Sequence, residues 1–177
     1  MDKPKVIGLD LSLASTGVAS SAGWVNCIIT KPDQHPTTFA RLRHIRTEVL
    51  LHVRGADLVV VEQLALGSQT GQHLTRAGMW HMVMDAIDAA DIPWTSATTQ
   101  QLKKYATGKG NASKDATLLA VARRFPEWDI TGNDEADSLV LAAMGSDYLG
   151  HPLAALPQTH REALDKVRWP DVLEVAR

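Results

Sequence analysis

Several features that mark particular classes of protein are scarce or lacking in this sequence. It has a single cysteine, Cys27, so no internal disulfide can form, and we expect a protein of a reducing cytoplasm. No apolar run approaches the roughly 20 residues that a membrane helix needs, and the first residues lack a signal-peptide pattern. Repeats and low-complexity tracts are also lacking. What remains is the composition of an ordinary globular protein.

An excess of positive charge is lacking too. The chain carries 18 lysines and arginines against 20 aspartates and glutamates, which gives a formal net charge of -2. If nucleic acid is the partner, its contacts must come from a local positive patch. The 177 residues suffice for one domain with a substantial core but not comfortably for two. We expect this domain over residues 1–150, followed by a C-terminal extension, 151–177, of unknown role.

The order of the expected elements indicates an α/β fold. Three strand-like runs, at 6–11, 18–22 and 24–29, suggest an antiparallel meander. A β-branched run at 58–61 predicts a buried central strand, and a fifth strand is expected at 93–96. Apolar spacing and capping residues predict helices at 38–53, 74–90, 98–105, 113–125 and 133–148, with a capping box at 159–162. We therefore predict a mixed five-stranded sheet flanked by helices on both faces.

The helix expected at 74–90 has two apolar stripes. One stripe consists of Trp80, Val83, Met84 and Ile87, and the other of Met79, Met82, Ala86 and Ala89. One stripe can face the sheet, and the other then needs a different cover. We expect that cover to be a second copy of the chain, in a homodimer.

Four carboxylates stand at positions where they can meet. Asp10 ends the first strand and Glu62 ends the central strand, so in a parallel pair both side chains reach one edge of the sheet. Asp134 and Asp137 lie three residues apart on one side of a helix, where Asp137 borders the apolar stripe. Taken singly, each acid is more often a loop-facing or capping residue. Taken together in this order, the four favour a shared site.

Four acids in one site repel each other, which costs stability unless cations are present. Carboxylate oxygens suit Mg²⁺ or Mn²⁺, and the seven histidines show no ligand spacing. Two such ions about 4 Å apart can activate a water molecule and stabilise the leaving oxygen in phosphodiester cleavage. We therefore expect two Mg²⁺ ions per site, for which Mn²⁺ can substitute.

The segment from Ile92 to Pro126 is locally basic. Its only acid is Asp115, and it contains six basic residues, Lys103, Lys104, Lys109, Lys114, Arg123 and Arg124. Such a patch suits phosphate binding, although a charge run is more often a solvated helix face. Gly108 and Gly110 favour a loop whose backbone can approach a ligand closely.

Four stretches, in this order, resemble the RuvC family of the RNase H-like superfamily. They are Val6-Ile-Gly-Leu-Asp10 with Thr16-Gly17, Val59-Val-Val-Glu62-Gln63, Leu102-Lys103 through Gly108-Lys-Gly110 to Lys114, and Asn133-Asp134-Glu-Ala-Asp137-Ser-Leu139. The resemblance covers about residues 5–147. It implies a homodimeric nuclease that binds a four-way (Holliday) DNA junction and nicks two strands symmetrically, in a bacterial cell or a phage-infected host.

The resemblance also assigns roles to residues. Asp10, Glu62, Asp134 and Asp137 match the family's metal ligands, and Lys103 and Lys114 match lysines near the scissile backbone. We expect Lys114 to act in catalysis as well as in binding. The basic loop adds Lys104 and Lys109 to the expected DNA contacts.

One position departs from the family pattern. The family often has an aromatic residue, which disturbs base stacking, three positions after the central glutamate, and here that residue is Ala65. Leu66 follows it and is a candidate wedge, because apolar side chains can enter base steps. The departure leaves open whether other branched DNA is also cut.

Three further interpretations compete with a resolvase. A nuclease acting on RNA–DNA hybrids would share the same acids, whereas a non-catalytic binder of DNA structures predicts a broken acid set. An actin-like kinase or ATPase needs a second domain and a second phosphate motif, for which 177 residues leave no room.

Overall fold

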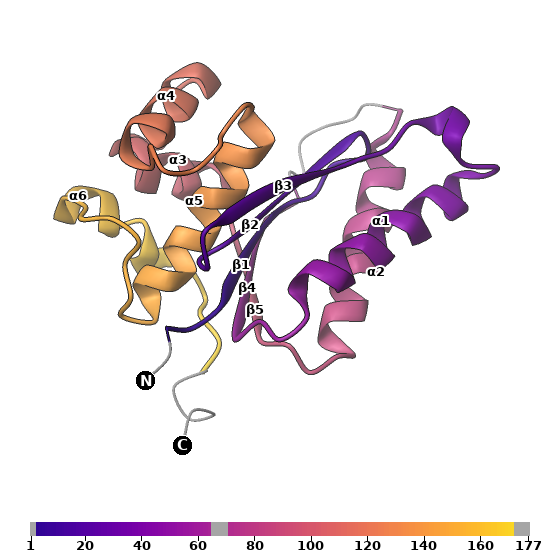
Figure 1. Ribbon diagram of the computed structural model, residues 1–177, viewed down its shortest axis with the longest axis horizontal. Coiled ribbons are helices and arrows are strands. Elements are labelled where there is room, and N and C mark those ends of the chain that lie inside the picture. Colours follow the sequence, from indigo (N-terminus) through magenta and orange to yellow (C-terminus); the bar gives the residue numbers. More distant parts are fainter. Residues whose placement is uncertain (1–2, 65–70, 172–177) are drawn as a thin grey trace.

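The computed structural model describes residues 3–64 and 71–171 (Figure 1). The strands are β1 (Val6–Asp10), β2 (Ser15–Ser20), β3 (Trp24–Ile29), β4 (Leu58–Glu62) and β5 (Trp94–Ala97). The α-helices are α1 (Thr38–Val53), α2 (His73–Asp88), α3 (Thr99–Thr107), α4 (Lys114–Arg124), α5 (Asn133–Tyr148) and α6 (Gln158–Arg161). Two 3₁₀ turns, η1 (Pro32–Gln34) and η2 (Leu164–Lys166), complete the described elements.

The expected strands and helices are all present. The largest difference is in β2, which begins at Ser15 rather than at residue 18, because the polar Ser15 and Thr16 pair with β3. The short helix α6 begins at Gln158, and Thr159 does not cap it as the capping-box pattern predicts.

The five strands form one mixed sheet in the order β3-β2-β1-β4-β5, which confirms the predicted fold class. The pairs β1–β2 and β2–β3 are antiparallel, and β1–β4 and β4–β5 are parallel. Leu9 is opposite Val61 in the parallel pair of β1 and β4. The two strands therefore end side by side at one edge of the sheet.

Helices cover both faces of the sheet, as Figure 1 shows. Alternate residues of β1 and β4 point to opposite faces. Ile7, Leu9, Val59 and Val61 pack with α1 and α2, and Val6, Leu58 and Val60 pack with α5. Helices α3 and α4 pack on α5, and the C-terminal segment completes this layer through buried Ala163 and Val167.

The buried side of α2 differs from the expectation of two separate stripes. Its buried residues are Met79, Val83, Met84 and Ile87, which come from both stripes. The reason is that α1 packs beside α2 on the same face of the sheet and covers part of the second stripe. Among the described residues, no helix is both long enough and apolar enough to span a membrane.

Glycines allow α5 to lie very close to the sheet. A Cβ atom at Gly8 would be 2.0 Å from the carbonyl oxygen of Ser138, and one at Gly17 would be 2.0 Å from that of Asp134. Only a residue without a side chain fits at either position. The contact at Gly17 fixes the place of the first turn of α5.

Candidate active site

The ends of β1 and β4 place the first two acids together. Asp10 and Glu62 each follow one residue after the paired Leu9 and Val61, and they lie close enough that, after burial, the charge of Glu62 raises the pKa of Asp10. The Glu62 Oε1 atom also accepts a hydrogen bond of 2.5 Å from the Thr99 hydroxyl, at the start of α3. The backbone carbonyl of Glu62 accepts one of 3.1 Å from Trp80 Nε1. Glu62 is thus held by hydrogen bonds from α2 and α3.

The first turn of α5 supplies the second pair of acids. Asp10 is paired with Gly17 in the sheet, and Gly17 contacts the backbone of Asp134. Asp134 and Asp137 consequently line the same cleft as Asp10 and Glu62. The structure therefore brings together the four carboxylates selected from the sequence.

Glu135 has a different role from its two acidic neighbours. Its Oε2 atom accepts hydrogen bonds from the backbone N–H groups of Thr131 and Gly132, at 2.6 and 2.8 Å, and from the Thr131 hydroxyl at 2.8 Å. These bonds give partners to backbone N–H groups at the N-terminus of α5, where such groups have none within the helix. Because Glu135 caps the helix, capping does not account for Asp134 or Asp137.

Crowding of carboxylates in the cleft changes their acidity. Burial, with Glu62, Asp137 and Asp134 nearby, raises the pKa of Asp10 from 3.8 to about 9. Burial, followed by the charge of Glu62, raises the pKa of Asp137 to about 6, against the opposing effect of Lys114 and Lys103. Both shifts have the same physical cause, which is negative charge held close together away from water.

The cleft fits a hard cation in its donor chemistry. Within residues 3–64 and 71–171, no three histidine, cysteine, aspartate or glutamate side chains are already arranged as a metal site. The four acids nevertheless offer only carboxylate oxygens, the ligands that Mg²⁺ and Mn²⁺ prefer. Their mutual repulsion, visible in the raised pKa values, is what a bound cation relieves.

The basic residues selected from the sequence separate into two groups. Lys103 and Lys114 line the cleft beside the acids. Lys104 instead forms an ion pair of 2.8 Å with Glu162 of the C-terminal segment, and Lys109 is exposed outside the cleft lining. Leu66, the candidate wedge, lies outside the described residues.

Some cleft residues were not identified from the sequence. Arg76 and His73 line the cleft from α2, across from the two lysines, and Thr99 lines it from α3. The spacing of His73 and Arg76, one turn apart on a helix that follows β4, is the signal that could have found them. Thr99 carries no motif, because only the parallel pairing of β4 with β5 brings it to Glu62.

The raised pKa of Asp10 predicts how the stability of the metal-free protein depends on pH. Between pH 4 and 9 the folded protein holds a proton that the unfolded chain has released, so stability falls as the pH rises through this range. We expect the Tm in EDTA to be higher at pH 5 than at pH 8.5 by at least about 3 °C, which corresponds to about 1 kcal/mol in a chain of this size. Asp10→Asn should flatten this difference, and a wild-type Tm that rises with pH would contradict the prediction.

Similarity to solved structures identifies the fold. No family model and no curated protein matches the chain. Among solved structures, RuvC of Thermus thermophilus is similar at a TM-score of 0.66 and 21% identity, over 83% of this chain and 97% of that one. The same protein in complex with a Holliday junction substrate is similar at a TM-score of 0.63 and 22% identity, over 84% of this chain and 97% of that one. The yeast mitochondrial Holliday junction resolvase Ydc2 is similar at a TM-score of 0.54 and 11% identity, over 92% of this chain and 81% of that one. This chain therefore has the RNase H-like fold that is seen in RuvC-type resolvases.

Proposed function

We propose that the protein is an endonuclease that resolves four-way (Holliday) DNA junctions by metal-dependent cleavage, in recombination or repair. The observation that carries this proposal is one cleft in which four carboxylates lie beside two lysines, at the edge of an RNase H-like sheet. The similarity in fold to resolvases, one of them solved with a junction, supports the choice of branched DNA as the substrate.

The residues of the cleft divide the chemistry among them. Asp10, Glu62, Asp134 and Asp137 would hold two Mg²⁺ ions, which can activate a water molecule and stabilise the leaving oxygen. Lys103 and Lys114 supply positive charge on the α3 and α4 side, where a phosphate would approach the acids. Thr99 keeps one oxygen of Glu62 engaged and so limits the rotation of that carboxylate.

Lys114 is expected to contribute more to cleavage than to binding. Lys114→Ala should lower the single-turnover rate of junction cleavage about 10²-fold, because charge beside a reacting phosphate counts most in the transition state. The Kd for the junction should rise less than about fivefold, the value of one exposed ion pair. Arg123→Ala removes the same charge from the exposed end of α4 and is the control. Equal losses in rate and affinity for Lys114→Ala would contradict this role.

A homodimer through α2 is the second element of the proposal. Leu74 on this helix is 84% exposed, and Ala89 after its end is exposed as well. We expect the mass of a dimer in solution at micromolar concentration, and a shift toward monomer in Leu74→Glu. Leu119→Glu, which alters an exposed leucine of α4, is the matched control. A monomeric wild type would contradict a dimer.

Cleavage of a set of labelled substrates tests the proposed function directly. A synthetic four-way junction is compared with flap, Y-shaped, linear duplex and RNA–DNA hybrid substrates, with Mg²⁺ or EDTA. Paired symmetric nicks in the junction alone are the expected result. Equal cutting of flaps and Y-forms would indicate a general debranching nuclease, and cutting of hybrids alone would indicate a nuclease of the RNase H kind. Binding of junctions without any cutting would leave a DNA-structure binder.

A further inference from the structure

Three consecutive residues after α5 contact the layer that carries the basic loop. His160 donates a hydrogen bond of 2.9 Å from Nδ1 to the carbonyl oxygen of Tyr105 in α3. Arg161 binds both carboxylate oxygens of Asp147 in α5, at 2.6 and 3.0 Å. Glu162 pairs with Lys104 of α3 at 2.8 Å. The segment 157–170, named here the brace, thus bridges α3 and α5.

The brace supplies a hydrogen-bond donor at the C-terminal end of α3, where backbone carbonyl groups lack partners within the helix. His160 supplies the partner for Tyr105, and Arg124 of α4 donates a 2.6 Å bond to the carbonyl of Ala106. The Thr107 hydroxyl donates a hydrogen bond of 2.8 Å to the carbonyl oxygen of Lys103. Gly108 ends the helix in a left-handed conformation, and His160 and Arg124, from outside α3, satisfy carbonyl groups next to this end.

The same histidine contacts the first glycine of that loop. Gly108 has a positive φ of 79°, and a Cβ atom there would be 3.0 Å from His160 Nε2. At its far side, Gly110 lies close to the backbone of Gln100, since a Cβ atom there would be 3.2 Å from the Gln100 carbonyl oxygen. His160 therefore packs against the loop that connects Lys103 to Lys114, the two lysines of the cleft.

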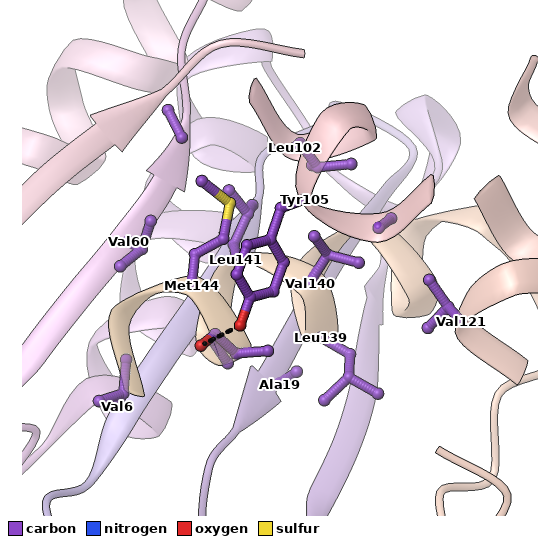
Figure 2. Packing of buried hydrophobic residues seen from close by; sticks show 14 of the residues in the cluster. Val6, Ala19, Val60, Leu102, Tyr105, Val121, Leu139, Val140, Leu141 and Met144 are labelled. Carbon is purple, nitrogen blue, oxygen red and sulfur yellow. Dashed lines mark hydrogen bonds between the residues drawn. The ribbon is translucent and has the colours of Figure 1, made fainter. Parts of the chain in front are cut away.

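The brace is firmly anchored, so it can act as a support. The Asp147 side chain is fully buried, and the Tyr105 hydroxyl donates a 3.1 Å bond to it. Figure 2 shows Tyr105 among Leu102, Leu141 and Met144 in the core. Near the C-terminal end of the brace, Trp169 stacks on Tyr148 with ring centroids 4.3 Å apart and planes 7° from parallel, but this contact is separate from those of His160 and Arg161 and does not reach α3.

We propose that the brace positions the basic loop and the two cleft lysines for DNA cleavage, with His160 as its positioning residue. This inference rests on the proposed function only for its effect on cleavage. Its physical content is that contacts from the C-terminal extension hold residues 107–112 in one conformation. The extension, which carries no recognised sequence motif, thereby gains a function in the active site.

Amide hydrogen exchange tests the positioning without reference to any activity. In His160→Ala, amides of residues 107–112 should exchange about tenfold faster than in the wild type, because the loop loses its support. His160→Asn should restore slow exchange, since its amide can donate to the Tyr105 carbonyl. Trp169→Leu removes the stack on Tyr148, in the same segment but away from the loop, and should leave these amides unchanged. No change in His160→Ala, or an equal change in Trp169→Leu, would overturn the proposal.

Single-turnover cleavage of the four-way junction, well below the Tm of each variant, tests the consequence. The rate should fall about tenfold in His160→Ala, recover in His160→Asn and stay unchanged in Trp169→Leu. In His160→Ala the Kd for the junction should change by a smaller factor than the rate does. Faster exchange without slower cleavage would show that the brace is only structural and would overturn its positioning role. A wild type that cuts no junction would refute the proposed function, and the exchange experiment would still decide the role of the brace.

Discussion

Replacing Asp10 with asparagine is expected to abolish Mg²⁺-dependent cleavage of the junction, with a fall in rate of about 10³-fold or more. The amide keeps the shape of the side chain but loses the charge that a metal ion requires, and Asp10 stands at the centre of the four acids. The Kd for the junction should stay within a few-fold of the wild type, because the lysines remain in place. Cleavage and binding are measured on the same labelled junction, with binding assayed in Ca²⁺ or EDTA.

A second measurement on Asp10→Asn separates a loss of metal binding from a loss of folding. The metal-free variant should be more stable than the wild type at pH 8, by about 1–2 kcal/mol, because asparagine is neutral in both the folded and the unfolded state, so folding no longer requires Asp10 to take up a proton. Stabilisation by added Mg²⁺ should shrink or vanish, since only ligands of the folded state raise the Tm. Asp33→Asn, on an exposed turn, provides the control. Full activity in Asp10→Asn would exclude the proposed site.

Gly17→Ala is expected to have the second largest effect. The added methyl group would be 2.0 Å from the carbonyl oxygen of Asp134 and 3.2 Å from Ser138 Oγ, so the first turn of α5 must move. We expect a loss of about 2–3 kcal/mol in the free energy of unfolding, as for overpacked cores. Cleavage should fall about 10²-fold even where the protein is folded, because Asp134 and Asp137 shift relative to Asp10.

Two other glycines provide comparisons for this prediction. Gly8→Ala creates a similar clash one turn further along α5, at 2.0 Å from the carbonyl of Ser138, and should lower stability to a similar extent. Gly71→Ala meets no atom within 4 Å and should leave stability unchanged. Denaturant titration measures all three variants. A Gly17→Ala protein of normal stability and activity would show that α5 does not need this close approach.

The metal-site acids could be selected from the sequence because their positions follow from local rules. Asp10 and Glu62 each end an apolar strand, and parallel pairing brings such ends to one edge. Asp134 and Asp137 are related by the geometry of a single helix. Helices α1 and α5 were predicted with their observed bounds, since apolar spacing and flanking caps agree there.

The partner of each lysine in the basic patch does not follow from the sequence, for a physical reason. Lys103 and Lys104 are adjacent in the sequence, but neighbouring residues on a helix point about 100° apart. Lys103 faces the cleft, whereas Lys104 pairs with Glu162. Charge patterning identifies the segment and does not say which lysine faces which partner. Contacts such as that of His160 with Tyr105 join residues far apart in the chain, so no local pattern predicts them.

The close seating of α5 on the sheet has a consequence for the motions of the cleft. Asp10, Glu62 and the two aspartates of α5 belong to largely buried elements, which we expect to open less readily than exposed ones. Lys114 instead begins an outer helix, and the loop before it is largely solvent-exposed. The acids thus form the more rigid half of the cleft, whereas the position of Lys114 depends on the support that the brace gives to the preceding loop. Adjustment to differently shaped DNA branches would come from the lysine side, while the spacing of the acids stays constant from one substrate to the next.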